Sequence, residues 1–424
     1  MKTLDAIAAQ LEGYDPQALP AASVTAFLEA LVTPLQTTRT VALADALDQI
    51  LAGDVISPID VPPHDNSAMD GYAFDGAVLG SAGPVQLTVV GTAMAGAAWR
   101  GNVGPGECVR IMTGAVMPSG LDTVVPQELI RANNDGIAFA ADRLRAGDNR
   151  RLQGEDLKIG LPALRAGSRI GPAALGLLAS LGITEVSVVR RLKVAFFSTG
   201  DEILSLGEAP REGAVYDSNR YTLMGLLRRM GVDTLDLGLV PDDPDALREA
   251  FEAATQQADT VITSGGVSVG EADHTKAVMR AMAGENSIAF WRVAMRPGRP
   301  MAVGRIGDKV VFGLPGNPVA VMVTFLAFVR PALLRMMGCT VTALPQLRAH
   351  SAASIRKKPG RTEYQRGIVG YASDGRLEVH TTGQQGSGVL RSMVEANGLI
   401  VLDHARGDVA AGELVDVMMF DGVI

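Results

Sequence analysis

Three loops rich in glycine and proline follow apolar, strand-like runs within one stretch of the chain. They span residues 261–273, 292–300 and 313–318. A backbone with several glycines can approach an anion closely and point its N–H groups at it. Loops at the carboxyl ends of parallel strands are also where open α/β sheets bind ligands. The three loops therefore predict one site that handles a phosphate or another oxyanion.

The middle loop adds positive charge to this prediction. Arg292, Arg296 and Arg299 have no acidic neighbours in sequence, and a Pro-Gly pair separates the last two. Guanidinium groups bind oxyanions and phosphates with two parallel hydrogen bonds. A solvated basic edge is the alternative, and the Pro-Gly turn favours the anion site. The first loop resembles neither a Walker A motif nor GxGxxG, and a tight turn without a ligand is its alternative.

Carboxylates follow the strand-like runs as well. Asp201 and Glu202 come after Gly200, Asp242 precedes a helix start, and Asp273 ends the first loop. Hard oxygen ligands of this kind suit Mg²⁺. An exposed turn is an equal alternative for residues 198–202. Asp243, followed by proline, has the pattern of a helix N-cap.

Alternating strands and helices must position these loops. Strand patterns over 194–197, 234–240, 260–263 and 310–312 alternate with helix patterns over 219–230, 245–257 and 318–337. Ser218 and Asp243 are the expected caps, and we expect a bend at Pro331. This alternation predicts a mostly parallel sheet with helices on both faces.

The remaining segments have different patterns. Residues 1–60 favour helices, including 24–31 after Ser23 and 41–51, up to a proline-rich boundary at 57–63. Short β-branched runs between glycines predict a β-rich module from about 64 to 150. Residues 172–181 favour a helix, 184–189 a strand, and 340–424 a small all-β domain.

Composition excludes several classes of protein. The 424 residues are 47% hydrophobic with 48 glycines, which is typical of a multidomain globular α/β protein. The net charge of −8 argues against non-specific nucleic-acid binding. The two cysteines are far apart, and the histidines lack the spacing of a zinc site. We find no signal-peptide pattern and no uninterrupted apolar run long enough to span a bilayer. These features favour a cytoplasmic protein without a membrane segment.

Ten motifs, in order over nearly the whole chain, resemble those of the molybdopterin molybdenumtransferase (MoeA) family, which includes the E domain of gephyrin. They are residues 67–73, 110–115, 154–156, 197–202, 216–219, 242–244, 264–273, 297–300, 313–318 and 359–361. The resemblance implies a discontinuous N-terminal linker domain (1–62 with 151–190), a β-rich inserted domain (63–150), a central three-layer α/β domain resembling molybdopterin adenylyltransferase (191–338) and a C-terminal β-barrel (339–424). It also implies a homodimer whose site is shared between protomers.

The activity that the resemblance implies is insertion of molybdate into adenylylated molybdopterin, with Mg²⁺-dependent cleavage of the phosphoanhydride. The products are molybdenum cofactor and AMP. The acidic residues that would position Mg²⁺ and the attacking water or oxyanion are Asp201, Glu202, Asp242 and Asp273. The second protomer would supply Asp70 and Thr113 to the same site. The implied substrate-binding residues are Gly265, Gly266, Ser268, Gly270, Arg292, Arg296, Arg299, Pro315, Pro318, Arg366 and Ser387.

Partners and rivals follow from the same resemblance. A molybdopterin adenylyltransferase would supply the substrate, and molybdoenzymes would accept the product. Many members carry lysine where this chain has its three loop arginines, which retunes geometry without changing charge. The rival hypotheses are the adenylyltransferase step, disfavoured by the extra domains, and a scaffold protein, disfavoured by the acidic site residues.

Overall fold

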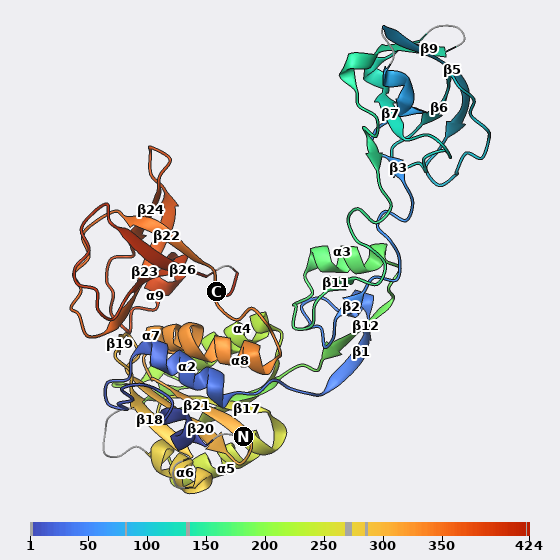
Figure 1. Cartoon of the computed structure of the whole chain (residues 1–424). Coiled ribbons are helices and arrows are strands. Elements are labelled where there is room, and N and C mark those ends of the chain that lie inside the picture. Colours follow the sequence, from blue (N-terminus) through green and yellow to red (C-terminus); the bar gives the residue numbers. More distant parts are fainter. Residues whose placement is uncertain (1–2, 81–82, 133–135, 268–273, 285–286, 421) are drawn as a thin grey trace.

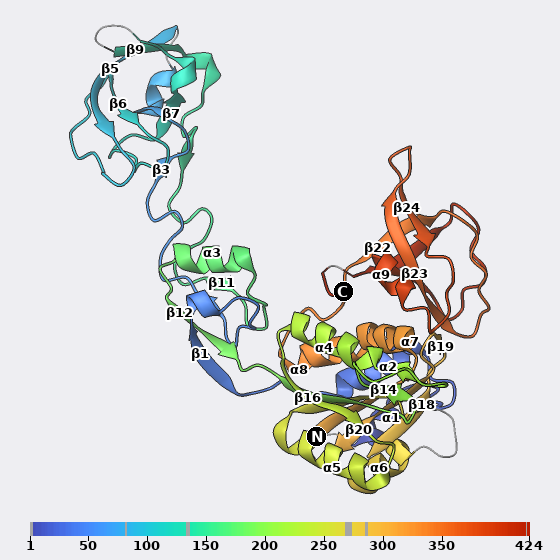
Figure 2. The same cartoon turned by 180° about the vertical axis from the view of Figure 1, so that it is seen from behind.

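The computed structural model describes residues 3–80, 83–132, 136–267, 274–284, 287–420 and 422–424. The chain is elongated (Figures 1 and 2). An α/β domain and a β-barrel lie together at one end, and a β-rich domain lies at the far end of a narrow linker domain. The fold is thus the multidomain α/β architecture that the sequence predicts.

A six-stranded sheet forms the centre of the α/β domain. Its order is β16 (Asp233–Val240), β13 (Lys193–Thr199), β17 (Thr260–Ser264), β21 (Lys309–Leu314), β20 (Pro300–Ile306) and β18 (Ile288–Arg292). The first four strands are parallel, and β20 runs antiparallel to both of its neighbours. Arg292 pairs with Pro300, so the β18–β20 connection lies at the edge where the parallel strands end. The three loops therefore leave the sheet at one edge.

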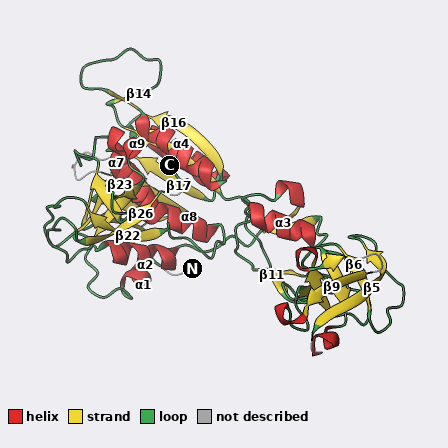
Figure 3. Ribbon diagram, turned by 90° about the horizontal axis from the view of Figure 1, so that it is seen from above, coloured by secondary structure: helices red, strands yellow, loops and turns green. Residues whose placement is uncertain are grey.

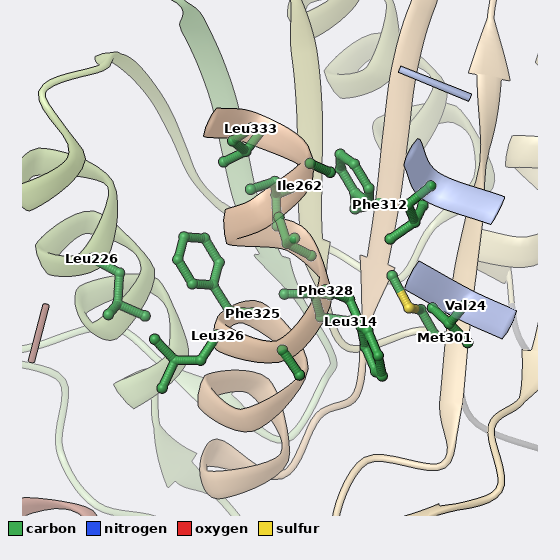
Figure 4. Close-up of a cluster of buried hydrophobic side chains, with 14 of the residues drawn as sticks. Val24, Leu226, Ile262, Met301, Phe312, Leu314, Phe325, Leu326, Phe328 and Leu333 are labelled. Carbon is green, nitrogen blue, oxygen red and sulfur yellow. The ribbon is translucent and has the colours of Figure 1, made fainter. Parts of the chain in front are cut away.

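Helices cover both faces of this sheet. α5 (Pro244–Gln257) and α6 (His274–Ala283) pack on one face, over Phe197, Val261 and Val311. α4 (Ser218–Met230), α7 (Pro318–Thr324) and α8 (Arg330–Met336) pack on the other, over the alternate side chains of the same strands. Figure 4 shows the core on this second face. The three layers follow from the period-two alternation of buried strands.

A continuous helical segment from Pro318 to Met336 is long and apolar enough to cross a membrane. Most of it is buried inside the α/β domain, where Phe325 and Phe328 belong to the apolar core (Figure 4). It is therefore the core helix of this domain. A π-helical turn at Phe325–Val329 interrupts it just before Pro331, which has no N–H for the carbonyl of Ala327.

The N-terminal segment differs from the helical prediction. α1 (Leu4–Ala8) and α2 (Ala21–Leu31) form, and both belong to the core of the α/β domain (Figure 1). The predicted cap Ser23 lies inside α2, which begins after Pro20. The predicted helix over 41–51 is wrong. Thr38–Ala42 forms β1, because its β-branched residues pair with the distant strand β12 (Glu185–Val189).

The linker domain combines this β1–β12 ribbon with α3 (Pro172–Ser180) and the pair β2 (Val55–Ile56) and β11 (Pro162–Leu164). The pair β3 (Asn66–Ser67) and β10 (Arg150–Arg151) leads to the inserted domain. That domain holds a six-stranded sheet in the order β7 (Thr123–Pro126), β4 (Gly71–Phe74), β6 (Glu107–Ile111), β5 (Pro84–Ala93), β9 (Gly136–Ala140) and β8 (Arg131–Ala132).

The C-terminal strands close into a five-stranded barrel. Its circuit is β23 (Thr362–Tyr371), β24 (Leu377–Thr381), β22 (Gln346–Ser351), β26 (Leu414–Met419) and β25 (Gly398–Leu402), which pairs back to β23. The short strand β19 (Met295–Arg296), from the second loop, pairs with β23. The barrel is therefore joined by backbone hydrogen bonds to the loop that carries the arginines.

Candidate functional site

A cavity of about 1080 Å³ lies where the carboxyl edge of the sheet meets the barrel. All three loops that the sequence singles out contribute to its wall, together with the N-terminus of α4 and a barrel loop. The predicted site residues that line it are Glu202, Gly265, Gly266, Arg296, Arg299, Pro315, Pro318 and Ser387. The volume is ample for a ligand larger than a simple oxyanion.

Two glycines form the turn that follows β17. Gly265 and Gly266 have positive φ angles of 90° and 62°. A Cβ on Gly265 would lie 2.3 Å from the carbonyl oxygen of Thr199, and one on Gly266 would lie 2.0 Å from Oγ1 of Thr275. Only glycine fits this turn, so its backbone is exposed to the cavity without side chains. The remaining predicted residues of this loop, Ser268, Gly270 and Asp273, lie outside the described residues.

The third loop leads directly into the N-terminus of α7. Asn317 is the N-cap residue and Pro318 occupies the first turn. The next amide, Val319 N–H, donates to the carbonyl oxygen of Ser387 in the barrel at 3.1 Å. This bond joins the barrel loop to the helix start, and it explains how Ser387, far away in sequence, reaches the cavity.

The N-terminal turn of α4 holds two of these loops in place. Asn219, only 6% exposed, donates through Nδ2 to the carbonyl oxygen of Gly316 at 2.7 Å. Ser198 Oγ donates to Asp217 Oδ1 at 2.9 Å, and Ser198 Oγ lies 3.0 Å from Ser264 Oγ. Ser264 immediately precedes the glycine turn. One turn therefore fixes the positions of both backbone loops.

The arginines divide into two groups. Arg296 and Arg299 are exposed and line the cavity, whereas Arg292, the last residue of β18, is exposed but is not part of the cavity wall. Arg296 also borders a second cavity of about 200 Å³, where Arg356 and Arg366 reach it from the barrel side. Arginine side chains from both domains thus meet at their junction.

Arg366 is a buried cation, with 1% of its surface exposed. Its Nε donates to Ser392 Oγ at 2.9 Å, and one terminal nitrogen donates to the carbonyl oxygen of Gly386 at 3.0 Å. Burial, and then the nearby charge of Arg296, lower the pKa of Arg366 to about 10. The guanidinium remains charged at neutral pH in a position where charge is costly. An anion in this junction would lower that cost.

A buried carboxylate stands among these cations. Glu363, whose side chain is 4% exposed, pairs with Arg361 at 2.7 Å and accepts from Gln365 at 3.1 Å. Arg361 in turn lines the main cavity. The carboxylate balances part of the positive charge and orients Arg361 toward the cavity wall.

The predicted metal ligands lie after β13 and β16, which are neighbours in the sheet. Glu202 lines the cavity, and Asp242 is half-buried with its Oδ1 shielded from solvent. Asp201 is exposed, and its carbonyl oxygen accepts from Arg211. Within the described residues no three acidic, histidine or cysteine side chains form a metal site. Glu202 and Asp242 thus offer part of a hard donor set, and Asp273, outside the described residues, is the remaining predicted ligand.

Asp70 and Thr113 form a pair in the inserted domain, which lies at the opposite end of the molecule from the α/β domain and the barrel (Figure 1). The backbone N–H and the hydroxyl of Thr113 both donate to Asp70 Oδ1 at 2.7 Å. These two bonds and the charge of Arg110 hold the pKa of Asp70 below its usual value. The pair is built to present an ionised carboxylate, and one chain does not bring it to the cavity.

Sequence reasoning assigned no role to several residues that shape the cavity. Tyr216, Asp217 and Asn219 lie in the motif 216–219, and Arg361 lies in the motif 359–361; both motifs stand out in the sequence only through the family resemblance. An asparagine and an aspartate at the start of a helix are usually caps. Only the tertiary contacts show that Asn219 bonds to a distant loop instead of capping its own helix.

Comparison with known families defines the class of protein. Residues 195–335 match the family model described as a probable molybdopterin binding domain. Residues 19–182 match the MoeA N-terminal region (domain I and II), and residues 348–420 match the MoeA C-terminal region (domain IV). The α/β domain with its cavity is therefore of the molybdopterin-binding class, flanked by two MoeA-specific regions.

The chain belongs to the MoeA family. It is 42% identical over 398 residues to a molybdopterin molybdenumtransferase of Haemophilus influenzae, covering 94% of this chain and 97% of the relative. A Nostoc molybdopterin molybdenumtransferase is 37% identical, with 90% and 89% covered. The crystal structure of a Pyrococcus horikoshii molybdopterin biosynthesis MoeA protein superposes with a TM-score of 0.79 at 28% identity, covering 95% and 100%. The chain is accordingly a transferase of molybdenum cofactor biosynthesis.

Proposed function

We propose that this enzyme inserts molybdate into adenylylated molybdopterin, with Mg²⁺-dependent cleavage of the phosphoanhydride and release of molybdenum cofactor and AMP. The observation that carries the proposal is the composition of the cavity wall. Exposed backbone at Gly265 and Gly266 faces the same space as Arg296 and Arg299, with Glu202 on the strand side. Bare backbone suits a phosphate, arginines suit an oxyanion, and a carboxylate suits the metal between them.

Mg²⁺ would be held by Glu202 and Asp242, with Asp273 from the segment outside the described residues and Asp201 beside them. Bound there, the metal would neutralise charge as the anhydride breaks. Arg366, Ser387 and the loop arginines would hold molybdate at the junction with the barrel. Ser268 and Gly270, which lie outside the described residues, would also bind phosphate.

We further propose that the working enzyme is a homodimer, in which the inserted domain of one protomer supplies Asp70 and Thr113 to the cavity of the other. Two features support this arrangement. The pair lies too far along the chain's extended arm to join its own cavity (Figure 2). The linker domain also exposes large apolar side chains that a second copy would cover. They are Ile56, Ile59, Leu152, Ile159 and Leu161.

The reaction would take place in the cytoplasm, between a molybdopterin adenylyltransferase that supplies the substrate and molybdoenzymes that accept the product. Both cysteines are free, Cys108 buried and Cys339 partly buried. Burial raises the pKa of Cys108 to about 12 and that of Cys339 to about 11, so both stay protonated and unreactive. Free thiols of this kind are typical of a reducing compartment.

The direct test supplies the purified full-length protein with adenylylated molybdopterin, Mg²⁺ and molybdate. We expect AMP release that requires both Mg²⁺ and molybdate, together with cofactor that activates a cofactor-free molybdoenzyme. AMP release that ignores molybdate would refute the proposed reaction. ATP consumption with free molybdopterin would instead identify the adenylyltransferase step.

The shared site has its own test. Asp70→Asn and Glu202→Gln proteins, each inactive, are unfolded together in equal amounts and refolded. In a randomly mixed population half of the dimers are hybrids with one intact site in two, so about a quarter of wild-type activity returns. Absence of recovery in hybrids verified by native mass spectrometry would refute sharing of the site.

A further inference from the structure

Tyr216 is the one aromatic side chain among the described residues that line the main cavity. The rest of that wall consists largely of glycine, proline, arginine and small polar residues. Tyr216 closes the short strand β15 (Val215–Tyr216), which pairs with β14 (Ile203–Leu204) directly after the exit of β13. Tyr216 thus follows the residue whose backbone bonds to Glu202, and Tyr216 and Glu202 both line the cavity.

The position of this ring is fixed from several sides. Its hydroxyl donates to the carbonyl oxygen of Glu208 at 2.8 Å. The flanking backbone is held by Val215 N–H to the carbonyl of Glu202 at 2.8 Å and by Asp217 N–H to that of Leu204 at 3.0 Å. Glu208 belongs to the long loop between β14 and β15, which projects from the α/β domain (Figure 3). A tethered ring loses little freedom when a ligand binds.

The ring is also not used by the protein's own core. Tyr216 is 42% exposed, and it belongs to none of the apolar clusters of the described residues. Its neighbour in sequence Val215 is 56% exposed and lines the same cavity. An oriented aromatic ring that is partly exposed in a ligand cavity is available for stacking with a flat group.

We propose that Tyr216 is the stacking wall for a planar heterocycle of the substrate. This rests on the proposed function, whose substrate carries two such groups, a pterin and an adenine. Neither the arginines nor the glycine turns recognise a flat ring, since they offer charge and N–H groups to anions. Tyr216 thus supplies the binding chemistry that the rest of the wall lacks, and it determines specificity for the heterocyclic part.

The experiment measures equilibrium binding of AMP and, under anaerobic conditions, of molybdopterin to the full-length protein by calorimetry. Stacking of a base on an aromatic ring predicts that Tyr216→Ala weakens one of the two by about 5- to 100-fold. Tyr216→Phe keeps the ring and should bind within about threefold of the wild type. Tyr221→Ala is the matched control, because Tyr221 is 39% exposed, pairs with Arg220 and does not line the cavity.

The outcomes separate this inference from the proposed function. Weaker binding of AMP alone assigns the ring to the adenine, and weaker binding of molybdopterin alone assigns it to the pterin. Wild-type affinity of Tyr216→Ala for both ligands overturns the stacking role, whatever the activity assay shows. A wild-type protein that binds neither ligand and releases no AMP overturns the proposed function and this inference together.

Discussion

Asn219 offers the most direct test of how the cavity is built. Its Nδ2 donates to the carbonyl oxygen of Gly316 at 2.7 Å, and its Oδ1 is buried and has no partner among the described residues. Within the described part of the chain, Asn219→Ala therefore removes this one side-chain hydrogen bond. Gly316 is exposed, so water can replace the donor, and the loss of stability should be about 1 kcal/mol. In a domain of this size the melting temperature should fall by only a few degrees.

The effect on substrate binding should be larger than the effect on stability. Without Asn219 the loop at 315–318 loses one of its restraints, and the substrate must restore that order on binding. Fixing one residue of backbone costs about 1–2 kcal/mol, which corresponds to about a 5- to 30-fold rise in KM. We expect kcat to fall less, because the acidic residues at the ends of β13 and β16 are untouched.

The assay is AMP release as a function of substrate concentration, with thermal unfolding measured on the same preparations. Gln49→Ala is the control, because Gln49 is equally buried at 6% exposure and its side-chain amide also donates to a backbone carbonyl, that of Asp45. It lies in the linker domain, away from the main cavity. If Asn219→Ala loses stability but keeps a KM within twofold of the wild-type value, then Asn219 does not order the loop at 315–318 for substrate binding.

Three further changes test other parts of the site. Gly266→Ala places a Cβ 2.0 Å from Thr275 Oγ1 and should lower the free energy of unfolding by about 2–5 kcal/mol. Gly207→Ala is the control, because nothing lies within 4 Å of its Cβ, and it should lower that free energy by about 1–2 kcal/mol. Urea unfolding measures both variants. Burial lowers the pKa of Arg366 to about 10, and the same burial would act on a lysine, whose ordinary pKa is about 10.4. The lysine of Arg366→Lys should therefore lose its proton at about pH 8, and the affinity for molybdate should fall above that pH. The same variant should gain stability as pH rises from about 8 to about 10, because the native state then binds its proton less tightly than the unfolded chain. Glu363→Gln should lower unfolding free energy by about 2 kcal/mol without weakening molybdate binding, as measured by calorimetry.

The α/β domain was predictable because its signals are local. Buried strands, the Asp243 cap and the glycine that ends α4 at Gly231 can all be recognised within a few residues, and each is present. The expected cap Ser218 is one residue late, since Asp217 accepts from Arg220 N–H at 3.1 Å. The apolar spacing of residues 41–51 fits a helix, so the sequence pattern predicts the wrong structure there. The strand β1, which reaches into this segment, pairs with β12 more than a hundred residues away, and a local pattern does not reveal that partner.

The candidate site was predictable only in part. Loop convergence followed from strand order, so the glycines and two arginines meet as expected. The C-terminal domain also carries a cluster of basic residues that does not form one exposed surface, namely Arg356, Lys357, Lys358, Arg361 and Arg366. Lys357 is 4% exposed and donates to the carbonyl oxygen of Arg406 at 2.6 Å, and Arg366 is buried, so two of its cations are structural or enclosed. Burial of a charged side chain depends on which loops pack over it, and adjacent residues in the sequence do not encode that.

The cavity wall carries charges of both signs, and this bears on how two substrates meet. Arg296 and Arg299 of the second loop and Arg361 of the barrel line the cavity together with Glu202, which follows β13. A free oxyanion is repelled from the carboxylate and attracted to the arginines. In the proposed reaction the phosphoanhydride would lie against the glycine turn after β17 and the carboxylates that would hold Mg²⁺. We infer that the oxyanion binds at the arginines, which come from both the second loop and the barrel, so the cavity must span both domains for the two substrates to react.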